Sequence, residues 1–134
     1  MNKKGFSLIE LLIVIVIIGI IVIIAVPSLL ESKKAAQETA ATAMLRNLAS
    51  AEVAYSSKST NQGFYGSLTN LTTQGFIDNR FSGGTATIDG YAFTAAALSY
   101  EFTITGTAQQ PGNPDFYINH TMTVFYTNGS PVSR

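Results

Sequence analysis

The sequence predicts an α+β fold in which one long N-terminal helix packs against a small antiparallel β-sheet. Residues 11–26 carry no charged and no ordinary polar side chain, and residues 31–58 repeat apolar side chains every three or four positions. Much of the chain after Tyr91 alternates apolar and polar side chains with period two. A chain of 134 residues has room for one modest domain beyond the apolar block, so we expect one helix and one sheet.

The apolar block is long enough to cross a membrane when residues 6–10 and 27–30 are added to it. About 20 helical residues at ~1.5 Å per residue cover the ~30 Å hydrocarbon core of a bilayer. Lys3 and Lys4 favour a cytoplasmic N-terminus, although Lys33 and Lys34 follow the block and reduce the charge asymmetry. A secretory signal peptide has a shorter apolar region, so we expect a membrane anchor.

One carboxylate interrupts this apolar segment. Glu10 lies in the first turn and a half of the predicted helix. An ionisable group inside a membrane span costs about 2.5–3.5 kcal/mol on insertion scales, and it therefore marks a functional contact. A plain membrane anchor would leave Glu10 without a role, so we expect a cationic partner for it.

Residues 3–30 resemble the leader and N-terminal helix of type IV pilins and the related pseudopilins. The resemblance rests on Lys-Gly followed by Phe-Ser-Leu-Ile-Glu-Leu-Leu-Ile-Val-Ile, with Gly19 and Pro27 further along. It implies that a prepilin peptidase cuts between Gly5 and Phe6 on the cytoplasmic side and methylates the new amine of Phe6. The mature subunit would remain in the inner membrane until an assembly platform and motor extract it into a helical homo-oligomeric filament at the cell surface.

The resemblance also predicts how the pilin fold divides this chain. The parts are a removed leader (1–5), a transmembrane and filament-core helix half (6–30), an amphipathic helix half (31–58) and a globular domain of αβ-loop and antiparallel sheet (59–134).

The residues around the cleavage point fit this scheme physically. Gly5 has no side chain to obstruct a peptidase that holds the extended backbone. Cleavage would create a cationic amine on Phe6, and two unit charges at ~4 Å attract by about 4 kcal/mol at an effective dielectric near 20. Glu10 of a neighbouring subunit is the natural anion, but Glu10 of the same chain is four residues away and competes. The resemblance favours the contact between subunits.

Gly19 and Pro27 bound the weakest part of the predicted helix. Helix interiors lose about 1 kcal/mol at Gly and about 3 kcal/mol at Pro. The resemblance implies that this segment can lose its helicity in an assembled filament, whereas the simpler expectation is a proline kink in a continuous helix.

The predicted core joins the amphipathic helix half to the sheet. Residues 59–84 are rich in turn formers, Asp89-Gly90 and Asn128-Gly129 predict turns, and alternation runs through residues 98–105 and 116–126. The apolar helix stripe is expected at Ala41, Met44, Leu48, Ala51 and Tyr55. The expected helix–sheet core residues are Met44, Leu48, Tyr55, Tyr100, Phe102, Ile104, Met122 and Val124.

Composition excludes several classes of function. The chain has eight basic and eight acidic residues, and loss of Lys3 and Lys4 would leave it acidic, so nucleic acid is not expected as a primary partner. Cysteine is absent, which rules out a disulfide or a thiolate site. Many type IV pilins close a C-terminal loop with a disulfide, so this departure leaves short pilins and pseudopilins open.

No enzyme and no cofactor are expected. His120 is the single histidine, and its alternating context favours a structural role in a strand. The major pseudopilins of type II secretion bind calcium in a C-terminal loop, and Asn113 and Asp115 are weak candidates for such a site here. Calcium prefers six to eight oxygens and several carboxylates, so we expect no metal.

The expected function is therefore that of a major pilin, which polymerises into a type IV pilus for adhesion, motility, surface sensing or DNA uptake. The alternative is a pseudopilin of a type II secretion system. A third class is a membrane-anchored periplasmic binding domain.

Overall fold

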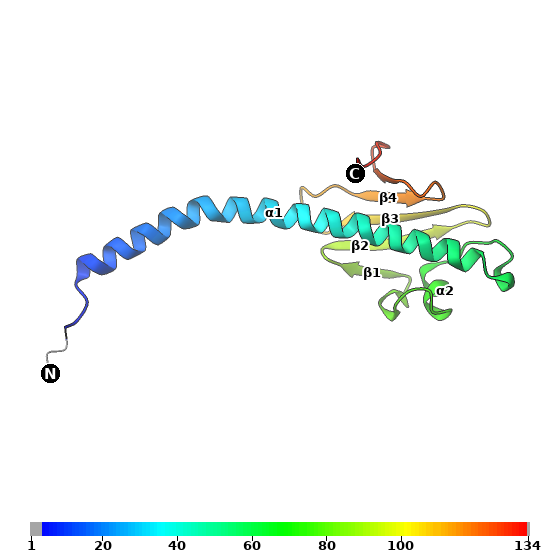
Figure 1. Ribbon diagram of the computed structural model, residues 1–134, viewed down its shortest axis with the longest axis horizontal. Helices are drawn as coiled ribbons and strands as arrows, with labels where there is room; N and C mark the ends of the chain where they lie inside the picture. Colours follow the sequence, from blue (N-terminus) through cyan, green and yellow to red (C-terminus); the bar gives the residue numbers. More distant parts are fainter. Residues whose placement is uncertain (1–3, 134) are drawn as a thin grey trace. The chain divides into compact units, whose positions relative to one another are not determined.

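The computed structural model describes residues 4–133 of the chain, so Met1, Asn2 and Lys3 of the predicted leader lie outside the described residues (Figure 1). Its helices are α1 (Leu8–Ser56) and α2 (Leu68–Thr73), with short 3-10 turns η1 (Ser59–Asn61) and η2 (Asn79–Phe81). The strands are β1 (Thr85–Ile88), β2 (Tyr91–Ala97), β3 (Phe102–Ala108), β4 (Phe116–Asn119) and β5 (Val124–Tyr126). Neighbouring strands pair antiparallel in chain order, which confirms the predicted α+β class.

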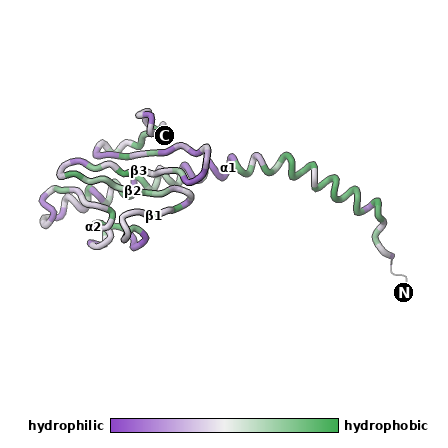
Figure 2. The backbone as a smooth tube through the Cα atoms, turned by 180° about the vertical axis from the view of Figure 1, so that it is seen from behind, coloured by the Kyte–Doolittle hydropathy of each residue, from purple (hydrophilic) through white to green (hydrophobic). Residues whose placement is uncertain are grey.

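The chain forms two compact units that divide after Ala35. In the first unit every described residue from Lys4 to Lys33 is exposed, and Pro27 lies inside α1 without ending the helix. Hydrophobic residues run along this part of α1 with few interruptions, as the hydropathy colouring in Figure 2 shows. In the second unit, buried positions on α1 begin at Ala41.

Within the second unit, the later part of α1 lies across one face of the sheet (Figure 1). The core between these layers contains Ala41, Leu45, Leu48 and Ala49 from α1, and Tyr91, Phe93, Phe102, Ile104, Phe116, Ile118 and Val124 from the strands. A fully buried large apolar side chain contributes roughly 1.5–3 kcal/mol. Gly106 makes room for this packing, because a Cβ there would lie 3.1 Å from Cε1 of Phe93.

The two-residue period holds within the strands but not across the turns that join them. Phe102 and Ile104 are buried as expected from their alternation. Tyr100, however, is 73% exposed, and the prediction that it belongs to the core is wrong. It lies in the β2–β3 turn, which the Leu98 N–H closes by donating to the Glu101 carbonyl at 2.7 Å.

Met122 is the second error in the predicted core. It is 40% exposed and has a positive φ of 61° in the turn between β4 and β5, where its N–H donates to the Asn119 carbonyl at 2.9 Å. The predicted strand also placed His120 in an alternating pattern, but His120 lies exposed in this same turn. A reversal of chain direction breaks the alternation even where apolar residues keep their spacing.

The helix contributes a broader stripe to the core than the one predicted. Leu48 is buried in this core and Met44 packs at its margin, whereas Tyr55 is buried in a separate cluster with Ala51 and Leu71 and not among the strand residues. Leu45 and Ala49 are also fully buried, because a helix lying on a sheet covers more than one line of side chains.

The first strand was not anticipated, although the turn that follows it was. Asp89 and Gly90 have φ values of 50° and 81°, which is the type I′ geometry that joins two antiparallel strands tightly. They bring Ile88 of β1 opposite Tyr91 of β2. Strand β1 is short, threonine-rich and only half-buried, so it carries little apolar signal.

Candidate functional site

The residues around the predicted cleavage point lie just before the start of α1. Residues 4–7 have no regular structure, and Phe6 is 88% exposed. A Cβ added to Gly5 would meet no atom within 4 Å. The Gly5–Phe6 bond is therefore accessible and outside the helix, which is the state that a peptidase needs in order to hold an extended backbone.

Glu10 is anchored at this same end of the helix. Its Oε2 accepts a hydrogen bond from the backbone N–H of Ser7 at 2.8 Å. Ser7 precedes the first helical residue and Glu10 is the third, so this bond is one half of a capping box. The partial positive charge of the helix N-terminus also favours a carboxylate here. Lys4, Gly5, Phe6 and Glu10 line one shallow hollow on the surface.

The helix that follows Glu10 presents large apolar side chains to its surroundings on all sides. Among them, Leu8 is 83% exposed, Ile23 is 74% exposed and Leu29 is 68% exposed. Part of α1 is long and apolar enough to cross a membrane. A helix that is apolar all round is stable only when lipid or other protein covers it.

The globular unit holds a buried carboxyl group that the apolar repeat did not predict. Glu52 is completely buried, and its Oε2 accepts a hydrogen bond from the Gly66 N–H at 3.0 Å. Its Oε1 has no hydrogen-bond partner among the described residues. Burial raises the pKa of Glu52 to about 7, against the opposing effect of the Gly66 bond. The sequence does hold a signal for this burial: Glu52 lies four residues after Leu48 and three before Tyr55, so it shares a helix face with these two buried residues.

The weak calcium candidates take part in closing a loop. The Asp115 Oδ1 accepts a hydrogen bond from the Ala108 N–H at 2.7 Å. The Asn113 side-chain amide donates to Gln37 Oε1 at 3.2 Å, while its own Oδ1 is buried without a partner in the described part of the chain. The described residues contain no group of three or more His, Cys, Asp or Glu side chains that could hold a metal ion.

The N-terminal segment matches a known sequence family. The model of the prokaryotic N-terminal methylation motif matches residues 1–26. No curated protein and no solved structure gives a significant match to the chain. The motif is typical of type IV pilins and pseudopilins, so the resemblance found in the sequence is confirmed for this segment.

Fold and motif together define the class of protein. A long N-terminal helix packed on a five-stranded antiparallel sheet is a pilin-like α+β fold. In its motif and its fold the chain is similar to type IV pilins and pseudopilins, which are generally structural proteins. Its methylation motif implies processing by prepilin peptidase, and its apolar helix is consistent with a membrane-anchored precursor.

Proposed function

We propose that this protein is a major pilin, which loses residues 1–5 and polymerises through α1 into a type IV pilus. The observation that carries the proposal is an exposed apolar helix with one carboxylate, Glu10, a single turn beyond the proposed cleavage point. Such a surface has to be covered, and identical apolar helices packed side by side would cover it. Before assembly, membrane lipid would do so, with the N-terminus on the cytoplasmic side.

Cleavage would change the charge balance around Glu10. In the uncut chain this carboxylate accepts the Ser7 N–H of its own helix. Removal of the leader would add a cationic amine at Phe6, so that a cation–anion contact with Glu10 of a neighbouring subunit becomes available. An isolated charge in apolar surroundings is costly, so pairing of Glu10 with this amine would favour assembled over isolated subunits. Methylation would convert the primary amine of Phe6 into a secondary amine, which still carries a positive charge when protonated.

The helix between Gly19 and Pro27 is the proposed site of local melting during assembly or extension. Pro27 lacks a backbone N–H and so removes one hydrogen bond from α1. A Cβ added at Gly19 would meet no atom within 4 Å, and Pro27 is exposed. The inner-membrane platform and motor are the partners proposed to draw the subunit out of the membrane.

The same N-terminal motif occurs in pseudopilins, and the chain has no disulfide that would favour the large pilins. A short periplasmic pseudopilus of type II secretion is therefore the second candidate. Shearing the cells distinguishes the two, because a pilin is expected in long extracellular fibres and a pseudopilin in the cell envelope. Mass spectrometry of the recovered polypeptide should show an N-terminus at Phe6. A polypeptide that retains residues 1–5 would contradict both candidates and favour a membrane-anchored binding domain.

Replacing Gly5 by valine is expected to block processing. A branched side chain next to the scissile bond obstructs the extended backbone that the peptidase must hold, so Gly5→Val should accumulate almost entirely as precursor. Immunoblots of membrane fractions would measure the ratio of precursor to mature chain. Gly19→Val is the matched control, because it makes the same change within the apolar segment and should be cleaved normally. Normal cleavage of Gly5→Val would contradict the assignment of the leader.

A further inference from the structure

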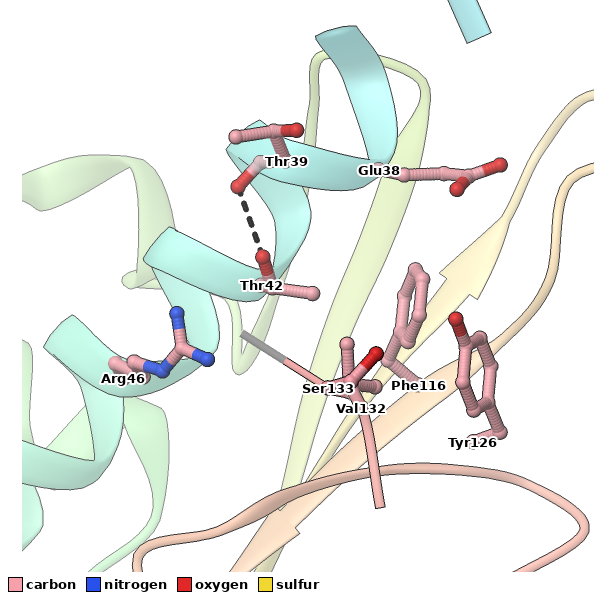
Figure 3. Close-up of a pocket in the computed structure, with 8 residues that line it drawn as sticks. All are labelled: Glu38, Thr39, Thr42, Arg46, Phe116, Tyr126, Val132 and Ser133. Atoms are coloured by element: carbon pink, nitrogen blue, oxygen red, sulfur yellow. Dashed lines mark hydrogen bonds between the residues drawn. The ribbon is translucent and has the colours of Figure 1, made fainter. Parts of the chain in front are cut away.

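A groove of about 470 Å³ runs along the second unit between α1 and the C-terminal side of the sheet (Figure 3). Thr42 of α1 borders it on the helix side, and Phe116, Tyr126 and Val132 border it on the sheet side. Phe116 belongs to the buried core, so the groove has an apolar floor. The groove lies wholly within the compact unit that follows Ala35.

The two ends of this groove carry opposite charges. Glu38 lies at one end and Arg46 at the other, with Phe116 and Val132 between them (Figure 3). Arg46 is exposed and Glu38 is half-buried. The ion pair found among the described residues joins Arg80 to Asp78, so neither groove charge is neutralised within the described chain. Eight helical positions separate Glu38 from Arg46, about 12 Å along the axis, which is too far for them to pair with each other.

We propose that this groove is a contact surface for a second copy of the chain, in which Arg46 of one copy pairs with Glu38 of the next. The inference rests on the proposed function, because subunits drawn from one membrane share the same orientation. If two parallel copies of α1 are displaced by about 12 Å along the helix axis, Arg46 of one copy lies at the same height as Glu38 of the other. Ala43, which is exposed between them in the sequence, leaves room for a neighbouring helix.

The contact has the symmetry that a filament requires. Each copy uses the Arg46 end of its groove toward one neighbour and the Glu38 end toward the other. Such a heterologous contact does not close on two copies and can repeat indefinitely. A two-fold dimer would instead stop at two copies: with parallel helices its like-charged ends would face each other, and with antiparallel helices both ends of the groove would be used by the same partner.

Paired cysteines test the contact directly, because the natural chain has no cysteine. In Glu38→Cys/Arg46→Cys an intrachain disulfide is excluded, since Cα atoms about 12 Å apart exceed the ~7 Å limit for a bridge. Mild oxidation of sheared fibres should give a ladder of covalent trimers and longer species. Each single-cysteine variant should give dimers at most. Glu38→Cys/Asn47→Cys is the matched control, because Asn47 lines a separate pocket on the other side of α1, and it should give no ladder.

Charge reversal tests whether the pairing matters for assembly. Glu38→Arg and Arg46→Glu should each lower the fibre yield by roughly fivefold, and the double variant should restore it to near the wild-type yield. Two outcomes would overturn the groove contact alone: fibres of Glu38→Cys/Arg46→Cys that form but give no ladder on oxidation, or a charge-reversed double variant whose yield stays as low as that of the single variants. Absence of wild-type fibres together with absence of the ladder would overturn the proposed polymerisation as well.

Discussion

Glu10→Ala is expected to lower the yield of sheared fibres at least tenfold, while membrane insertion and leader cleavage continue. The carboxylate is proposed to neutralise the Phe6 amine of a neighbouring subunit within an apolar helix bundle. Attraction of about 4 kcal/mol at ~4 Å is lost, and the amine is left unpaired in surroundings that do not solvate it. Since about 1.4 kcal/mol is a factor of ten, even partial loss of this attraction is enough to suppress assembly.

Two further variants separate the charge of Glu10 from its capping role. Glu10→Gln keeps an oxygen that can accept the Ser7 N–H but removes the charge, so its fibre yield should fall as far as that of Glu10→Ala. Glu31→Ala removes an exposed carboxylate of the same helix beyond the apolar block and should leave the yield unchanged. Normal fibres from Glu10→Gln would assign Glu10 to capping and remove it from the contact between subunits.

Glu52→Gln is expected to stabilise the globular unit, and to do so more strongly as the pH rises. The folded-state pKa of Glu52 is raised from 4.5 to about 7, so the folded protein binds more protons than the unfolded chain between these values. The free energy of unfolding of the wild type therefore falls as the pH rises from about 5 to 8. The charged, buried carboxylate costs on the order of 3 kcal/mol above pH 7, and glutamine does not ionise.

Thermal unfolding at pH 5 and pH 8 measures this effect. The Tm of Glu52→Gln should lie close to that of the wild type at pH 5 and roughly 10 °C above it at pH 8. Glutamine can still accept the Gly66 N–H, so the αβ-loop stays attached to α1. Glu101→Gln, in the exposed β2–β3 turn, is the control and should shift the Tm equally at both values. A shift for Glu52→Gln that is the same at both pH values would contradict the burial of an ionisable group here.

The success and failure of the sequence predictions have physical causes in particular residues. Phe102 and Ile104 were predicted correctly because alternation within one strand is a local property of the backbone. Tyr100 and Met122 were predicted wrongly because their spacing extends the pattern, while the backbone reverses direction at both places. The alternation alone does not distinguish a long strand from a strand followed by a tight turn.

Glu52 shows a different limit of sequence reasoning. A glutamate within an apolar stripe is usually assigned to the solvent side of a helix, because an unpaired buried carboxylate is costly. Here the segment that contains Gly66 lies over the helix and offers its N–H to the carboxylate. That segment is 14 residues away in the chain, so no local pattern links the two.

The N-terminal region shows how much a sequence can determine by itself. Its uninterrupted hydrophobicity, the single Glu10 and the Gly5–Phe6 junction lie within a few helical turns, and their chemistry does not depend on distant residues. The methylation motif can therefore be recognised from this segment alone, and the fold class follows once the alternation of the later strands is added. Only the tertiary structure revealed the buried Glu52 and the groove between Glu38 and Arg46, because both depend on which distant segments pack against α1. Periodicity describes one segment at a time, whereas burial and surface shape arise from segments brought together by folding.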